Sequence, residues 1–272
     1  MMKSHKIRDS VTDRIFNVFL TINCAGALLI AFCPLYFVLM ASMSDPQYVN
    51  SGRFLLYPAG FTLEGYQQVL ADERVWIGYV NSIIYALGGI LYGLVTAVPL
   101  GYALSRKELP CRKFLTGLFI FTMYFQGGMV LLYLTVKELG LIDTRLIIII
   151  LGSFAMYNVI IVRSYFASSL PEELREASLI DGCGDLRYFV KIALPLAKPI
   201  IAVVTLYILI AKWNEFTNAM IYLNKRKLYP LQLYLRELLL TFSSMAGSAT
   251  GAMAADAETL ERYHKLSQII RY

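Results

Sequence analysis

Four long stretches of the chain contain no aspartate, glutamate, lysine or arginine, and these stretches constrain the fold more than any other feature. They are residues 15–44, 75–105, 114–136 and 146–162. A helix needs about 20 mostly apolar residues, with a range of roughly 17–25, to cross the hydrocarbon core of a bilayer. Each stretch is long enough, and each is continuous, whereas the strands of a membrane barrel would alternate. The pattern predicts an all-α membrane protein.

The composition agrees with this prediction. Hydrophobic residues make up 57% of the chain and charged residues 16%, whereas soluble domains have about half and a quarter. The formal net charge of +6 is typical of basic residues retained on the cytoplasmic side of a membrane. The chain has no basic, aromatic-interleaved module, so we expect no nucleic-acid partner.

The hydrophobic pattern divides the chain into a short tail, residues 1–14, and one membrane domain, residues 15–272. A short surface helix is expected between Leu63 and Glu73. The membrane domain is predicted to contain five spans, at about residues 16–41, 79–104, 114–136, 146–162 and 199–223. Gln126-Gly127-Gly128 is expected to interrupt the third span.

The short loops predict the orientation. Lysines and arginines are dense in the tail, in the loop 105–113 and in the segment 163–198, so we expect these on the cytoplasmic side of a cell membrane. The opposite side carries almost as many, mostly in the long C-terminal segment, where the rule is weak. The N-terminus is therefore predicted to be cytoplasmic.

The segment 170–195 has the pattern of a helix–turn–helix. Ser168 or Ser169 can cap the first helix, Pro171 suits its first turn, and two glutamates follow where the helix dipole favours them. Asp181-Gly182 is a strong signal for a turn. Taken alone, the acidic start is most simply a solvated helix end.

The same segment resembles the EAA loop of ABC importer permeases. The matching residues are Glu176-Ala177-Ser178, Asp181-Gly182-Cys183, Phe189, Ile192 and Leu194-Pro195. Ser178 and Cys183 depart from the usual pattern, both by exchange of one small residue for another. Further pieces are similar to carbohydrate permeases of the maltose type and to a branch for complex saccharides. They are Asn81-Ser82, Gly101-Tyr102-Ala103, Trp213-Asn214-Glu215-Phe216, Phe125-Gln126-Gly127-Gly128 and Tyr229-Pro230-Leu231-Gln232.

This resemblance, which covers roughly residues 15–272, implies the bundle of a type I ABC importer and a set of partners. These are a second permease subunit, two ATPase subunits, an extracytoplasmic solute-binding protein and the lipid bilayer. It implies that Glu176 approaches a basic residue of an ATPase and that Gly182 permits the bend between the helices. The residues expected to couple to the ATPase are Glu176, Ala177, Asp181, Gly182, Phe189, Leu194 and Pro195. The expected substrate is a sugar or oligosaccharide, the alternative being another small solute.

Polar residues in the fifth predicted span can be read in two ways. Asn214 and Asn218, with Trp213 and Gln126, can line a substrate pathway, or they can pack helices together. Lys212 and Glu215 are three residues apart and can pair on one helix face.

Several chemistries find no support in the sequence. There is no phosphate-binding loop, so ATP hydrolysis is expected on a separate subunit and the chain is not expected to be an enzyme. The two histidines, His5 and His264, lie near the termini, and no pair of the four cysteines has metal or redox spacing. No metal site and no cofactor are expected. An ion-coupled secondary transporter is the rival class, but it would need more carboxylates or matched broken helices in the membrane.

The C-terminal part raises a separate expectation. Relatives of this type usually have six helices, but no stretch after residue 223 has the length and apolarity of a span. Residues 256–272 resemble the approach to a sixth helix, so we expect that this helix is missing from the sequence. The competing interpretation is a permease with five helices and an external C-terminus.

Overall fold

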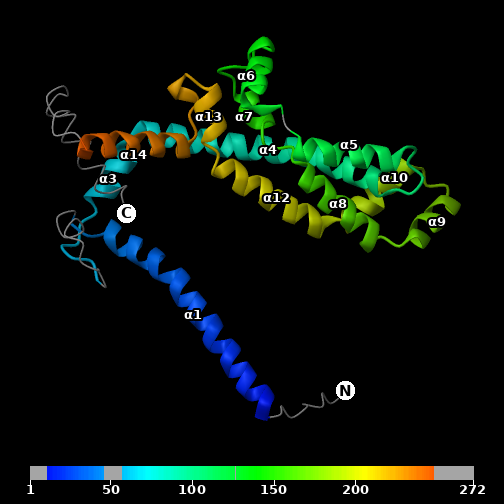
Figure 1. Ribbon diagram of the computed structural model, residues 1–272, viewed down its shortest axis with the longest axis horizontal. Coiled ribbons are helices and arrows are strands. Elements are labelled where there is room, and N and C mark those ends of the chain that lie inside the picture. The colour runs from blue at the N-terminus through cyan, green and yellow to red at the C-terminus, as the bar shows by residue number, and fades with distance from the viewer. Residues whose placement is uncertain (1–10, 46–56, 126, 248–272) are drawn as a thin grey trace. The chain divides into compact units, whose positions relative to one another are not determined.

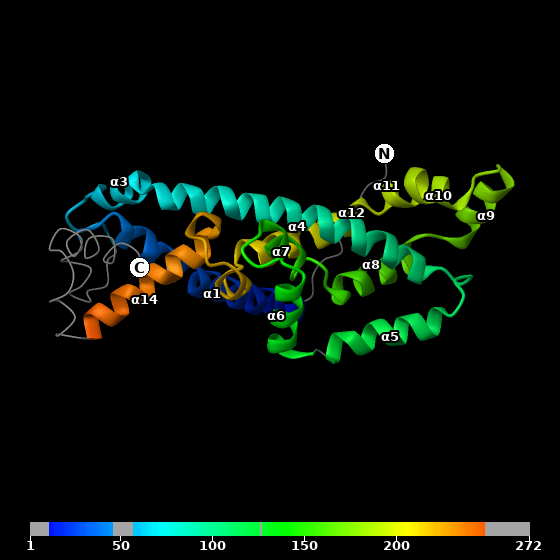
Figure 2. The same cartoon turned by 90° about the horizontal axis from the view of Figure 1, so that it is seen from above.

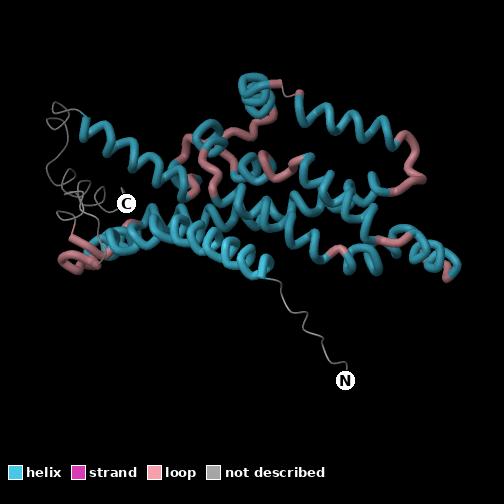
Figure 3. The backbone as a smooth tube through the Cα atoms, turned by 60° about the horizontal axis from the view of Figure 1, so that its bottom comes forward, coloured by secondary structure: helices cyan, strands magenta, loops and turns pink. Residues whose placement is uncertain are grey.

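The computed structural model describes residues 11–45, 57–125 and 127–247. Every regular element within these ranges is a helix and none is a strand (Figure 3). The all-α prediction is therefore confirmed. The chain divides into two compact units, one of Met1–Ala71 with Leu238–Tyr272 and one of Asp72–Glu237, and each is described by itself.

The first unit contains the long helix α1 (Val11–Ser42) and the short helix α3 (Glu64–Ala71). Most large apolar side chains of α1 are exposed, as suits a lipid-facing span. The Ser42 hydroxyl lies 2.8 Å from the Tyr66 hydroxyl of α3. Both the first span and the short surface helix are confirmed.

The core of the second unit is formed where α4 (Glu73–Ser105) packs against α8 (Met156–Ser169) and α12 (Lys198–Trp213) (Figures 1 and 2). The buried side chains Val98, Val162, Phe166, Val204 and Ile208 fill the space between them. Helix α4 begins at Glu73, earlier than predicted, because the Asp72 carboxylate accepts a hydrogen bond from the Arg74 N–H at 2.9 Å. Such a cap satisfies a backbone donor that the helix itself leaves unpaired.

Two glycines allow α4 to approach its neighbours closely. A Cβ atom on Gly101 would lie 2.6 Å from Cγ1 of Val162, and one on Gly93 would lie 2.5 Å from Cδ1 of Ile208. Small residues at helix contacts are characteristic of membrane bundles, where packing replaces the hydrophobic effect as the driving force.

The three later spans are broken. The break expected in the third span separates α5 (Arg112–Tyr124) from α6 (Gly128–Glu138). The uninterrupted helix expected over 146–162 is wrong: α7 (Arg145–Ile150) and α8 are separated at Gly152, whose φ of 76° ends a right-handed helix.

The continuous helix expected over 199–223 is also wrong, because α12 stops at Trp213 and α13 (Thr217–Tyr222) follows. The Glu215 carboxylate accepts a hydrogen bond from the Asn218 N–H at 2.9 Å and so stabilises the start of α13. The sequence around this break contains no glycine or proline that would have signalled it.

Within the described ranges, α1 and α4 are each long and apolar enough to cross a membrane alone. Two bent helix pairs qualify when each pair is taken as one span: α5 with α6, and Asp185–Leu196 with α12. The chain is thus a multi-pass membrane protein. The segment expected to approach a sixth helix lies outside the described residues.

The glycine contact yields a stability prediction. Gly101→Ala should lower the free energy of unfolding by about 1–3 kcal/mol, because the added methyl overlaps Val162 in a packed seam. Thermal unfolding of the purified protein in detergent measures this. The matched control is Gly26→Ala in α1, where a Cβ meets nothing within 4 Å. Equal melting temperatures for the two variants would contradict the role given to Gly101.

Candidate functional site

The segment after α8 folds as the expected helix–turn–helix. Its parts are α9 (Glu172–Ile180), α10 (Asp185–Tyr188), a π-helical turn η1 (Phe189–Ala193) and α11 (Leu194–Leu196). Figures 1 and 2 both place α9 and α10 at the end of the second unit where α4 passes into α5.

The start of α9 differs from the prediction in detail. Pro171 itself occupies the cap position, and no side chain caps the helix. The Ser168 hydroxyl instead donates to the carbonyl oxygen of Ser164 within α8, at 2.9 Å. The predicted serine cap is wrong because α8 continues to Ser169 and uses both serines.

The turn after α9 has the expected glycine geometry. Gly182 has a φ of 74°, and the Cys183 N–H donates to the Ser178 carbonyl at 2.9 Å, which closes the helix end. A Cβ on Gly182 would meet nothing within 4 Å. The requirement for glycine here therefore comes from the backbone conformation alone.

Helix α9 turns one face inward and one outward. Ser178 is buried, whereas Glu176 and Ala177 are exposed, and Ile180 beside them is 87% exposed. Within the described part of the chain no ion pair involves Glu176. The outward face thus combines an unpaired carboxylate with exposed apolar atoms.

The other predicted coupling residues divide between surface and core. Asp181 and Pro195 are exposed. Phe189 lies with its ring centroid 4.7 Å from that of Tyr102 on α4, and Leu194 packs against the buried cluster between α4, α8 and α12. The second half of the segment is therefore attached to the bundle by apolar contacts.

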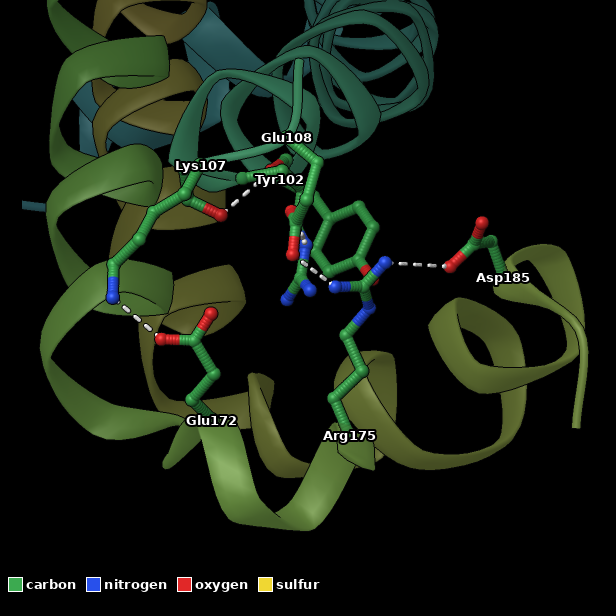
Figure 4. A network of polar contacts seen from close by, with 8 residues as sticks. Tyr102, Lys107, Glu108, Glu172, Arg175 and Asp185 are labelled. Carbon is green, nitrogen blue, oxygen red and sulfur yellow. Dashed lines mark hydrogen bonds and ion pairs between the residues drawn. The ribbon is translucent and has the colours of Figure 1, made fainter. Parts of the chain in front are cut away.

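The first half is attached by charges (Figure 4). The Arg175 guanidinium of α9 pairs with Glu108 in the α4–α5 loop and, at 3.3 Å, with Asp185 of α10. One turn away, the Lys107 ammonium lies 2.5 Å from the Glu172 carboxylate. These pairs hold α9 against a loop more than sixty residues earlier in the sequence.

Electrostatics within this network favour the charged forms. A hydrogen bond from its own backbone N–H, followed by the charges of Arg106 and Arg175, holds the pKa of the Glu108 carboxyl below its usual value. The Glu172 carboxylate raises the pKa of the Lys107 ammonium. Glu108 and Arg175 were not predicted as functional residues, since nothing in the local pattern of the loop indicates its distant partner.

The polar residues at the α12–α13 break are arranged differently from the prediction. Lys212 is buried and donates from Nζ to the carbonyl oxygens of Ile148, at 2.6 Å, and of Leu151. Its ammonium thus caps the C-terminal end of α7, where carbonyl groups lack helical partners. Among the described residues, Lys212 and Glu215 form no ion pair, so the pairing suggested by their spacing is not found.

Glu215 pairs with Asn218 instead. The Asn218 side-chain amide donates to the Glu215 carboxylate at 2.8 Å. A Cβ on Gly152 would lie within 4.0 Å of polar atoms of Lys212, Glu215 and Asn218. The two helix breaks therefore meet at one polar cluster around Gly152.

The remaining pathway candidates are more open. Asn214 is exposed, and its amide donates to the Ile210 carbonyl of its own helix at 2.9 Å. Trp213 is half-buried, with its ring 6.2 Å from that of Tyr79. Gln126 lies outside the described residues.

Two of the motifs singled out in the sequence contact each other. The Asn81 side chain donates to the carbonyl oxygens of Lys227, at 2.8 Å, and Tyr229, at 3.1 Å. The Leu231 N–H donates to the Ser82 hydroxyl at 3.0 Å. Arg145, which the sequence analysis did not single out, donates to the Asn81 side-chain oxygen at 3.1 Å. The loop before α14 (Leu231–Gly247) is thereby fixed to the first half of α4.

Among the described residues, no group of three or more histidine, cysteine, aspartate or glutamate side chains is arranged to hold a metal ion.

The sequence and the fold of this chain are both similar to those of known transport proteins. The family model for the binding-protein-dependent transport system inner membrane component matches residues 2–255. The chain is 32% identical to protein LplC of Bacillus subtilis (strain 168), with 99% of this chain and 90% of LplC covered. It is 33% identical to the polygalacturonan/rhamnogalacturonan transport system permease protein YtcP of the same organism, with 89% and 84% covered. A solved bacterial ABC transporter involved in the import of the acidic polysaccharide alginate contains a similar chain. That chain matches with a TM-score of 0.83 and 30% identity, and 98% of this chain and 93% of that chain are covered.

The ion network predicts the local stability of α9. Glu108→Gln should make the α9 backbone amides exchange with deuterium about threefold faster, because a half-exposed charged partner of Arg175 is lost. Hydrogen-exchange mass spectrometry of the purified protein measures this. The control is Glu176→Gln, which lies beyond the first turn of α9, is exposed and has no ion pair within the described residues, and which should leave the exchange unchanged.

The stability of α9, measured by the same hydrogen exchange, should fall at acidic pH. Because the pKa of Glu108 lies below its ordinary value of 4.5, the carboxylate stabilises the folded state fully above that pH and loses this effect as the pH falls through the folded-state pKa. Protection of α9 that is unchanged in Glu108→Gln would contradict the network.

Proposed function

We infer that this chain, which belongs to the family of binding-protein-dependent transport system inner membrane components, is the pore-forming permease subunit of an ATP-driven importer of sugars or oligosaccharides. The observation that carries this inference is the helix–turn–helix at 172–196, whose outward face leaves Glu176 unpaired within the described residues. A membrane bundle that presents such a helix offers a docking element to a protein outside the membrane. The permeases named above, to which the chain is similar, support the saccharide class.

The partners in the proposal are a second permease subunit, two ATPase subunits and an extracytoplasmic solute-binding protein. In this assembly α9 enters a cleft of one ATPase, and Glu176 meets a basic residue there. The exposed Ile180 adds apolar contact. The side of α9 is then the cytoplasmic side, and the N-terminus lies on that side as well.

The transmission of force follows from the two kinds of attachment. ATP-driven closure of the ATPases moves α9, and the Arg175 pairs pass this movement to the α4–α5 loop and to α10. The apolar contacts of Phe189 and Leu194 pass it to α4, α8 and α12. A rocking motion of the bundle between inward-facing and outward-facing states is the expected result.

Asn214 is the best candidate for a substrate contact. Its side chain is exposed beside a helix break and bonds to its own helix, so its amide oxygen can meet a sugar hydroxyl. Asn218 is engaged by Glu215, which favours a packing role for it. Trp213 beside Tyr79 provides an aromatic surface of the kind on which a sugar ring can stack.

Charge reversal tests the coupling. Glu176→Arg should leave the chain inserted in the membrane but prevent its association with the ATPase, because like charges would meet in the docking cleft. Co-purification with the ATPase, and ATPase stimulation by the binding protein, measure this. Glu173→Arg, a charge reversal on the same exposed helix, is the control and should keep the association with the ATPase. Normal transport by Glu176→Arg would refute the docking assignment.

A second substitution tests the pathway. Asn214→Leu should reduce substrate uptake severalfold with assembly unchanged, because it removes a hydrogen-bonding group without changing the helix. Uptake in vesicles measures this. Asn23→Leu is the matched control, since Asn23 is also exposed and also donates to its own helix, at 2.9 Å to Phe19. Unchanged uptake kinetics for Asn214→Leu would leave Asn214 a packing residue.

A further inference from the structure

A cavity of about 880 Å³ lies beside the first turns of α5, between this helix, the α4–α5 loop and α8. Four basic side chains line it: Lys107, Arg112, Lys113 and Arg163. The mechanism proposed above uses Lys107 for its contact with Glu172, but it assigns no role to the cavity.

The charge of the lining has one sign. None of the residues that line the cavity is acidic. Lys107 is paired with Glu172 at its edge, and Arg163 donates to the Leu104 carbonyl at 3.2 Å. For Arg112 and Lys113 the described residues provide no ion pair. Cations gathered in this way repel each other, so the cavity favours an anion.

The lining changes character along α5. The basic residues lie at the start of the helix and in the loop before it, whereas Phe114, Gly117 and Ile120 continue the wall along the helix. Ile120 follows Lys113 by seven residues, which corresponds to a rise of about 10 Å. Phe114 is 70% exposed. A polar mouth followed by an apolar wall matches a molecule with an anionic head and an apolar tail.

The mouth of the cavity lies at the level of the helix–turn–helix at 172–196, called the coupling segment from here on. The Lys107–Glu172 contact joins its edge directly to α9 (Figure 4). If α9 faces the ATPase, as in the proposed function, on which this step rests, the mouth opens at the cytoplasmic membrane surface. Anionic phospholipids in that leaflet attract basic residues, and basic pockets between membrane helices on that side hold lipid headgroups.

We propose that this cavity binds one anionic phospholipid, with its phosphate on Arg112, Lys113 and Arg163 and the start of an acyl chain along Phe114 and Ile120. The lipid compensates the cations and covers the exposed apolar wall of α5. Free phosphate or a nucleotide would satisfy the charges but leave the apolar wall exposed.

Native mass spectrometry of the full chain, purified from membranes with the subunits that accompany it, tests the proposal. The protein is exchanged into mixed micelles of phosphatidylglycerol and phosphatidylcholine, and the lipid retained per chain is counted. The wild type should retain one phosphatidylglycerol in preference to phosphatidylcholine. Arg112→Gln and Lys113→Gln should each lower this preference about fivefold, the effect of one basic residue at an anionic surface.

Two further variants separate binding in the cavity from general attraction. Gly117→Leu should abolish lipid retention with all charges intact. A Cβ at this position meets nothing within 4 Å, so the leucine side chain extends into the cavity and fills the space along its wall. Lys225→Gln with Arg226→Gln removes exposed cations from the loop before α14 and should change nothing. A thermal melt confirms that each variant is folded.

Equal retention in wild type, Arg112→Gln and Gly117→Leu would overturn the proposal. Displacement of the lipid by millimolar inorganic phosphate would show a site for a free anion and overturn it, as would loss of the lipid whenever a second permease subunit is bound. The measurement needs neither ATP nor substrate, so a chain that retains lipid but fails to bind an ATPase would contradict the proposed function and leave the lipid site standing.

Discussion

The close approach of α4 to α8 and α12 is the contact on which the second unit depends. Gly93 and Gly101 permit it, because a methyl group at either position would overlap Ile208 or Val162. In a bilayer the apolar faces of helices gain little by leaving lipid, so close packing has to supply the association energy. The same cluster extends to the buried Tyr188 and Ala193 of the coupling segment, which therefore rests on the bundle itself.

The broken helices follow from a second constraint. Backbone groups freed at a break inside a membrane must find partners within the protein. The Lys212 ammonium donates to a free carbonyl at the end of α7, and the Glu215 carboxylate accepts from a free N–H at the start of α13. Lys212 is bonded to backbone carbonyls, Glu215 to a backbone N–H and to the Asn218 amide, and the two breaks are held at one place around Gly152. A bundle with two fixed breaks has defined positions at which its halves can bend.

The coupling segment combines attachments of different physical character. Its second half is packed into the core through Phe189 and Leu194, and such contacts are insensitive to salt. Its first half is held by ion pairs at Glu108, Asp185 and Glu172, whose exposed parts are screened by salt and individually weak. Helix α9, the part proposed to dock to an ATPase, is therefore the more weakly attached half of the segment.

The sequence by itself determined the fold class, the α1 and α4 spans and the helix–turn–helix, because these depend on local composition and on the short-range signals Pro171 and Gly182. The resemblance of the segment 170–195 to the EAA loop also supplied Glu176 and Asp181 as candidate site residues, and their coupling role stays a prediction. Only the tertiary structure decided the partners of Lys212, Glu215 and Arg175. The bonds of Lys212 and the Arg175–Glu108 pair join residues more than sixty positions apart, whereas Glu215 bonds to Asn218 three residues away only because the helix breaks there. For the same reason the breaks at Gly152 and Asn214 within apolar stretches were not predicted: hydropathy records whether a segment can enter a membrane, whereas continuity of the helix depends on what surrounds it.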